Sequence, residues 1–381
     1  MRRLAVLTLA TILGAAALSA CGSSSTNTSS STPAPTGSSP TTAASVTVDT
    51  GNPTKAITLT ESGSSLVFPY LQELVAPLTA AFPNITLSPT AGGSGKGIAD
   101  ATAGTTLLGG SDAYLSPGQA SASPGLLNIP IVVSAQAVNY NLPGVNNLKL
   151  SGDVIAQMYT GKITKWNDPP IASLNPGANL PATTIVPVHR LDSSGDTFLF
   201  TSFLSATNSA WANGGPSLGT TVSWPSVPGA LTASGNPGMV QTCGMTPGCI
   251  AYVGVSAESD AQKANLGEAM LQNKSGQFTM PTSDAINAAV SASLGAVMPN
   301  LVANIIYADG PQSYPIVNFE YVIVKTMQAD ADSAKAVRTF FAFALDPNKG
   351  ATPTNLMKEG FVALPSSILP KVNTAVSKIT P

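Results

Sequence analysis

The chain has 381 residues, of which 43% are hydrophobic and 9% are charged, and its formal net charge is -2. This length and apolar content allow a large core and suggest two domains, whereas the lack of a basic patch argues against a nucleic-acid partner. The single histidine, His189, makes a histidine-based metal site or a Ser-His-Asp triad hard to build elsewhere, and we expect neither metal nor cofactor.

Residues 1–20 have the features of a signal peptide. A positive Met1-Arg2-Arg3 precedes an apolar run, Leu4 to Ala17, that is short for a transmembrane span. The run ends in Leu18-Ser19-Ala20-Cys21-Gly22, which is similar to a lipobox, where cleavage exposes a cysteine that becomes lipidated. We therefore expect an exported protein with lipid on Cys21, anchored to the outer face of the cell membrane; the alternative is a plain secretory signal with a chance cysteine.

Residues 21–45 are predicted to form a tether, and the folded part is predicted to begin at residue 46. The tether segment is rich in Ser, Thr and Pro and has almost no apolar anchors. Such a composition cannot bury enough surface to fold.

The next hundred residues predict strand–turn–helix units in series. Each turn is rich in Ser or Gly: the first contains Ser64, Ser65 and Leu66, the second contains Ser94, and the third contains Asp112. Such units favour an α/β fold with a mostly parallel sheet, whose ligands bind at the strand ends. The predicted strands are 56–59 and 85–90, and the predicted helices are 70–78 and a short Ala-rich helix after 91–97.

The glycine-rich segment 92–97 does not predict a nucleotide site. It lacks the Gly-Lys-Ser/Thr ending of an NTPase phosphate loop. It also lacks the spacing and the downstream acid of a dinucleotide fingerprint.

The remaining helices and strands are predicted from apolar runs and from the residues that interrupt these runs. The run 129–141 and the run 314–324 are interpreted as two crossover strands that enclose a second domain. Trp166 is interpreted as a packed anchor, with a ligand platform as the alternative. Further predictions are helix 152–159, a loop-rich stretch 208–247, strand 250–255, partly helical stretches 284–294 and 297–306, helix 331–344 and a last helix from residue 366.

The segment 189–197 lies between an apolar strand-like run, 184–188, and a helix-like run, 197–204. A turn at a helix N-terminus exposes backbone N–H groups that suit an anion. Arg190 adds a positively charged guanidinium group, which Asp192 can hold in place. The alternative is an ordinary strand–turn–helix with Ser194 as N-cap.

Cys243 and Cys249 flank a short Gly/Pro-rich loop, Gly244 to Gly248. An exported chain meets oxidising conditions, so the pair predicts a local disulfide. The alternative, a metal pair, lacks further ligands.

The polar candidates are mostly donors, and this suits a small tetrahedral oxyanion that must be surrounded by donors when buried. Carboxylates are the exceptions. A carboxylate accepts a hydrogen bond from phosphate, which still carries a proton at neutral pH, but repels fully ionised sulfate. Asp112 therefore favours phosphate over sulfate or molybdate.

From about Leu59 to Pro365 the sequence resembles the phosphate-binding lipoproteins of bacterial phosphate ABC transporters, the PstS family. The resemblance is carried by 63–66, 93–95, 110–116, 161–168, 174–177 and 190–195. It implies an α/β, two-lobed periplasmic-binding-protein-like fold, type II-like, with two crossover strands and a ligand cleft between the lobes. Lobe I would comprise 46–139 and 316–381, and lobe II 140–315.

The same resemblance implies how phosphate would be held. Donors would come from the first turn, the second turn and the 189–197 turn. Asp112, in the third turn, would be the acceptor that senses the phosphate proton, and Asp192 would orient Arg190. The implied partners are inorganic phosphate and the transmembrane permease subunits of a phosphate ABC transporter, with the protein a monomer. The expected phosphate-binding residues are Ser64, Ser65, Leu66, Ser94, Asp112, Arg190, Ser194, Gly195 and Asp196.

Asp196 departs from the family pattern, in which Thr commonly follows the Ser-Gly pair. Either Asp196 points away as a helix N-terminal acid, or it is a second acceptor for a phosphate proton, the interpretation that we favour. An enzyme with Ser64 or Ser194 as nucleophile and His189 as base is disfavoured, because His189 has no acid partner in a triad pattern. A structural lipoprotein would not need Arg190 and Asp112 in turns.

Overall fold

The structure, a computed structural model, describes residues 48–214 and 218–381. The predicted signal peptide, the predicted lipidation site Cys21 and the whole of the predicted tether lie outside the described residues. Within the described part of the chain, every helix is too short or too polar to cross a membrane.

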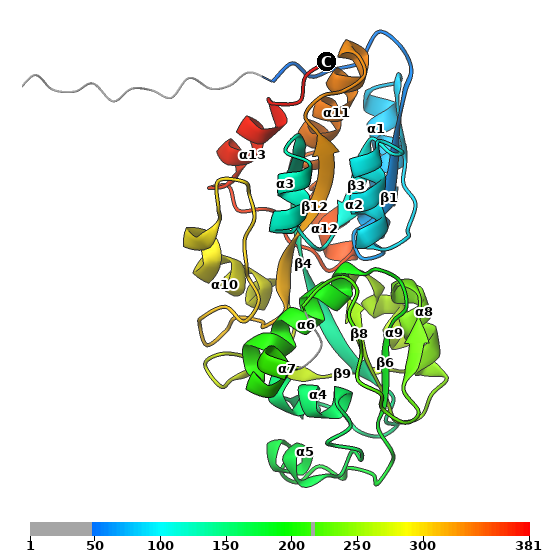
Figure 1. Ribbon diagram of the computed structural model, residues 1–381, viewed down its shortest axis with the longest axis vertical. Helices are drawn as coiled ribbons and strands as arrows, with labels where there is room; N and C mark the ends of the chain where they lie inside the picture. Colours follow the sequence, from blue (N-terminus) through cyan, green and yellow to red (C-terminus); the bar gives the residue numbers. More distant parts are fainter. Residues whose placement is uncertain (1–47, 215–217) are drawn as a thin grey trace, which may run out of the picture. The chain divides into compact units, whose positions relative to one another are not determined.

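The main sheet has nine strands, and its two ends are here called the first and second half-sheets. The first half-sheet contains the parallel strands β2, β1 and β3, with the antiparallel β12 next to β3 (Figure 1). β1 pairs in parallel with β2, with Ile57 opposite Ile85, and in parallel with β3 on its other edge. Apolar side chains of the flanking helices are buried against these strands. The elements are β1 (Ile57–Gly63), α1 (Phe68–Ala81), β2 (Ile85–Ser88), α2 (Ser94–Ala103), β3 (Leu108–Ser111), α3 (Pro117–Ala122), β12 (Val317–Lys325), α11 (Ala331–Ala344), α12 (Pro353–Lys358) and α13 (Leu369–Val376).

The second half-sheet is built around β6, which pairs in parallel with both β7 and β8. β9 (Gly267–Glu268) pairs with β4, and a separate small sheet contains β5 (Lys149–Leu150), β10 (Met270–Gln272) and β11 (Phe278–Thr279). The other elements are α4 (Gly152–Tyr159), α5 (Pro169–Leu174), β6 (Val186–Arg190), α6 (Gly195–Thr207), α7 (Ser209–Gly214), β7 (Leu231–Ala233), α8 (Gly235–Gly244), β8 (Cys249–Gly254), α9 (Glu258–Lys263) and α10 (Ser283–Ser293).

A single long strand, β4 (Leu126–Tyr140), belongs to both half-sheets. Its first ten residues, 126–135, pair with β12 except at one irregularity, and its last five, 136–140, pair with β8. Both pairings are antiparallel, as is the pairing of β12 with β3. The predicted parallel pairing therefore holds within each half-sheet, whereas the two long strands that join them run antiparallel to their neighbours.

One prediction for the irregular regions was wrong, because 297–306 contains no helix. The stretch 208–247, predicted as loop-rich, also contains α7, β7 and α8, which were not predicted. α8 begins with Gly235-Asn236-Pro237-Gly238, which obscured it. Its buried residues Asn236, Met239, Val240 and Cys243 nevertheless have the i, i+3, i+4, i+7 spacing of a helix packed on one face.

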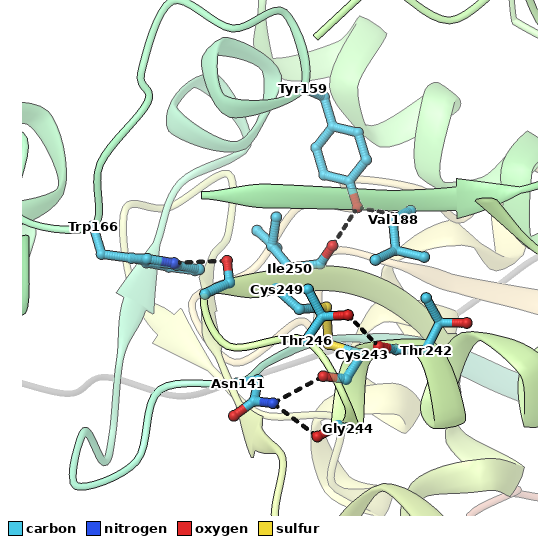
Figure 2. The surroundings of a disulfide bond; sticks show 11 residues. Asn141, Tyr159, Trp166, Val188, Thr242, Cys243, Gly244, Thr246, Cys249 and Ile250 are labelled. Carbon is cyan, nitrogen blue, oxygen red and sulfur yellow. Dashed lines mark hydrogen bonds between the residues drawn. A yellow bond between two sulfur atoms is a disulfide. The ribbon is translucent and has the colours of Figure 1, made fainter. Parts of the chain in front are cut away.

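The predicted disulfide is present, and it joins the end of α8 to the start of β8 (Figure 2). The Cα atoms of Cys243 and Cys249 are 5.3 Å apart. Asn141 Nδ2 donates to the carbonyls of Cys243 and Gly244 at 2.9 and 3.0 Å. Trp166 Nε1 donates to Gly248 O at 2.9 Å from a fully buried ring, so Trp166 is the packed anchor that we expected.

Candidate functional site

Every predicted ligand residue is buried, and all of them lie on turns at strand ends or helix starts. Three turns belong to the first half-sheet: β1 to α1, the start of α2, and the residues after β3. A fourth turn, from β6 to α6, belongs to the second half-sheet. The buried residues are Ser64, Ser65, Leu66, Ser94, Asp112, Arg190, Ser194, Gly195 and Asp196.

Asp112 connects the three turns of the first half-sheet. Ser64 Oγ donates to Asp112 Oδ1, and Asp112 N donates to Ser94 Oγ at 3.1 Å. The same Ser64 Oγ accepts from Leu66 N at 2.9 Å, which holds the turn before α1 in shape. Burial is the main cause that raises the pKa of Asp112 well above its usual value, and the nearby charge of Glu320 raises it further.

Arg190 is the charged centre of the second half-sheet, and its side chain is 1% exposed. Its Nε and Nη2 donate to Asp192 at 2.8 and 2.5 Å, a bidentate fork. Its Nη1 donates to Asp196 Oδ2 at 2.6 Å, and its Nη2 reaches Ser65 Oγ at 3.3 Å across to the first half-sheet. Burial opposes the charge of Arg190, but the two carboxylates outweigh it and raise its pKa.

Asp196 faces inward at the first turn of α6 and is fully buried. Besides Arg190, Asn236 Nδ2 donates to its Oδ2 at 3.0 Å, and Gln136 Nε2 donates to its Oδ1 at 3.0 Å. Burial is the main cause that raises the pKa of Asp196 to about 7. The charge of Asp112 adds to this rise, and the charge of Arg190 opposes it.

Sequence reasoning missed two residues that hold this arrangement together. Gln136 comes from β4 and Asn236 from the first turn of α8. Asn236 N also donates to Ser65 Oγ at 3.1 Å, a second bond between the half-sheets. For Gln136 the available signal was a polar side chain in an otherwise apolar run, which is informative when it occurs in a core strand. Asn236 follows Gly235 and precedes Pro237, so no such signal marked it.

Gly195 lies where the turns of the two half-sheets meet. A Cβ atom on Gly195 would overlap Asp112 Oδ2 and Ser94 Oγ. Nearby, Gly95 N donates to Ser193 O at 2.9 Å, again joining the two half-sheets. The absence of a side chain at Gly195 is therefore a steric requirement of this close approach.

Aromatic side chains pack next to Arg190 and next to its neighbour in the chain, His189. Tyr252 Oη accepts from Arg190 N at 2.8 Å, and the Tyr252 ring stacks on Phe200 with centroids 4.4 Å apart. His189 stacks on Trp224 with centroids 4.8 Å apart and an interplanar angle of 17°. Trp224 lines a cavity of about 350 Å³ together with Arg190. His189 is thus part of the aromatic packing around Arg190.

The fold resembles that of solved phosphate-binding proteins. A high-affinity periplasmic phosphate-binding protein, solved with phosphate bound, gives a TM-score of 0.64 at 24% identity, covering 84% of this chain and 93% of that one. The phosphate-binding protein from Stenotrophomonas maltophilia gives a TM-score of 0.63 at 19% identity, with the same coverage of both chains.

The two half-sheets, their joining strands and the turns that meet between them define a two-lobed solute-binding protein, and a PBP superfamily domain model matches residues 13–348. Phosphate-binding protein PstS of Methanocaldococcus jannaschii is 34% identical, covering 78% of this chain and 80% of the relative. Phosphate-binding protein PstS 3 of Mycobacterium tuberculosis is also 34% identical, covering 96% of each. The chain belongs to the PstS family of phosphate-binding proteins, which are solute-binding proteins rather than enzymes.

Proposed function

We propose that this protein binds inorganic phosphate and delivers it to a phosphate ABC transporter permease. The observation that carries the proposal is the buried Asp112 carboxyl, held among hydroxyl and backbone donors where the turns meet. An acceptor in a site made of donors suits an anion that still carries a proton, and phosphate is such an anion. Family membership supports the same ligand and the same transport partner.

We propose that the residues expected from the sequence form the phosphate site, with Asp192 orienting Arg190. Lobe I would comprise residues 46–139 and 316–381, and lobe II residues 140–315. Phosphate would enter with the lobes apart and would be held by lobe closure. The bonds from Ser65 to Arg190 and Asn236 support this, because they join the two half-sheets directly.

We further propose that the protein is exported and lipidated on Cys21, with residues 21–45 as its tether to the outer face of the cell membrane. The lipobox-like sequence supports this proposal. Several acyl groups on one cysteine anchor a protein firmly, so the protein would stay beside its permease. We propose that it acts there as a monomer. Mass spectrometry of the membrane fraction would detect the acylated cysteine, and an unmodified Cys21 in the mature chain would contradict it.

Asp112→Asn is expected to weaken phosphate binding roughly 10- to 100-fold and to introduce sulfate binding. The uncharged amide accepts a hydrogen bond from phosphate less strongly than a carboxylate does, and it no longer repels sulfate. The measurement is calorimetric titration of residues 22–381, stripped of bound anion, with phosphate and then sulfate at pH 7. The described fold is a compact unit from residue 46 onward, so this chain retains it.

Asp284→Asn, an exposed substitution in the first turn of α10, is the matched control and should leave both titrations unchanged. The wild type should bind phosphate one-to-one and should not bind sulfate. Equal heats from both anions, or none from phosphate, would contradict the proposed function.

For Asp196 we propose the role of second acceptor. Three donors reach its carboxylate oxygens, which leaves one acceptor position on a group that has about four. The bound state would then hold a proton between Asp196 and phosphate, whichever of the two carried it before binding. Because the pKa of Asp196 is raised to about 7, this proton is available at pH 6 and largely lost at pH 8, so phosphate should bind more tightly at pH 6 than at pH 8. Calorimetry across this range checks the proposal, and binding that strengthens at alkaline pH would contradict it.

A further inference from the structure

Glu320 is a fully buried carboxyl in β12, one of the two long strands that join the half-sheets. β12 pairs antiparallel with β3 so that Tyr321 lies opposite Ser111. The same register places Glu320 next to Asp112, the residue that follows Ser111. The pairing of β12 with β4 shifts between Glu320 and Tyr321, an irregularity of the kind that redirects side chains near functional sites.

The two oxygens of the Glu320 carboxyl have different surroundings. Oε1 accepts from Ser134 Oγ at 2.5 Å and from Asn318 Nδ2 at 2.8 Å. Oε2 is buried and receives no hydrogen bond from the part of the chain that the structure describes. A buried, ionised oxygen without a donor is costly, so this oxygen requires a proton from a neighbouring group.

Asp112 is the neighbour that can supply the proton. Asn318 Nδ2 also reaches Asp112 O at 3.4 Å, so one amide contacts both residues. The other ionisable groups facing the pair are Asp196, a further acid, and Arg190, whose donors are directed at Asp192, Asp196 and Ser65. Burial raises the pKa of both Asp112 and Glu320, and hydrogen bonding between them favours ionised Glu320 beside protonated Asp112.

We infer that Asp112 and Glu320 share one proton and that Glu320 is thereby a specificity-determining, positioning residue of the anion site. The inference rests on the proposed function, because it explains how an acidic site accepts an anion. With one shared proton the pair carries a charge of -1 instead of -2. The proton can reside on Glu320 when Asp112 accepts the phosphate proton, so Asp112 remains an acceptor without a second buried charge beside the ligand.

The pair should therefore set the alkaline limit of binding. Above the pH at which the shared proton is lost, a second negative charge faces the ligand and affinity falls. In Glu320→Gln the amide carries no charge, so this loss should be absent. At pH 9 the variant should bind phosphate about tenfold more tightly than the wild type, and at pH 6.5 the two should agree within about threefold, where tenfold corresponds to one pKa unit.

The titration is made with residues 22–381 and inorganic phosphate between pH 6 and 9. The ionisation of phosphate is identical for both proteins, so the ratio of their affinities isolates Glu320. Ser134→Ala is the matched control, because it removes a donor to Oε1 without removing the charge, and it should retain the alkaline loss. Affinity curves of wild type and Glu320→Gln that stay parallel would overturn the inference.

Infrared spectroscopy of the ligand-free protein tests the pair without phosphate and distinguishes the two proposals. A carbonyl band of a protonated carboxyl should be present at pH 7 in the wild type, should disappear at alkaline pH, and should be lost or shifted in both Asp112→Asn and Glu320→Gln. A band unchanged in either variant would overturn the shared proton even if phosphate binds. Absence of phosphate binding with the band as expected would contradict only the proposed function.

Discussion

Replacing Arg190 with Met is expected to lower the free energy of unfolding by about 3–5 kcal/mol and to abolish measurable phosphate binding. The substitution leaves Asp196 buried without its cation and removes the bidentate partner of Asp192. Breaking a buried ion pair from one side costs this much because the remaining charge is uncompensated. Urea unfolding gives the stability, and phosphate calorimetry gives the binding.

Two variants separate the charge effect from the loss of packing. Asp196→Asn combined with Arg190→Met removes both charges of the inner pair, so the double variant should be more stable than the sum of the two single effects predicts. Lys263→Met, which breaks an exposed pair with Asp260, should change stability by less than about 1 kcal/mol. An Arg190→Met protein as stable as the wild type would contradict the inference that Arg190 compensates the buried charge of Asp196.

Gly195→Ala is expected to weaken phosphate binding by about 1–3 kcal/mol, roughly 5- to 150-fold, with little change in melting temperature. The added Cβ would overlap Asp112 and Ser94 where the turns meet. The backbone at Gly195 is helical, so alanine itself is tolerated there. The substitution should therefore destabilise the arrangement in which the two half-sheets approach each other, and not the helix itself.

Gly118→Ala is the matched substitution, because Gly118 also lies in the first turn of a helix but has no atom within 4 Å of the added Cβ. It should leave affinity unchanged and stability equal or slightly higher. Wild-type affinity in the Gly195 variant would contradict the close approach of the two turns.

Elements with strong local signals were predictable from the sequence. The helices 152–159 and 331–344 were predicted with the bounds that the structure shows, because apolar spacing is a local feature. The structure adds their N-caps, Ser151 and Asp330. α8 was not predicted, since Gly and Pro occupy its first turn and its stability comes from tertiary burial.

The candidate site likewise contains residues that could be predicted from the sequence and residues that could not. The turns that contain Ser64, Ser94 and Asp112 were visible as Ser/Gly segments after strands, and the structure brings them together. Asn236 and Glu320 were not visible, because one depends on the packing of α8 and the other on strand register and an irregularity. Contacts that arise from long-range pairing have no signature in a short window of sequence.

The position of Trp224, which stacks on His189, bears on the fluorescence of the protein. All three tryptophans lie between residues 140 and 315, and Trp166 and Trp211 are buried away from solvent. Trp224 shares a cavity wall with Arg190 and Asp192. Intrinsic tryptophan emission therefore comes from residues 166–224 alone. We expect the emission of Trp224, which lies beside Arg190, to change when an anion occupies the proposed site, so that binding can be followed by fluorescence without an added dye.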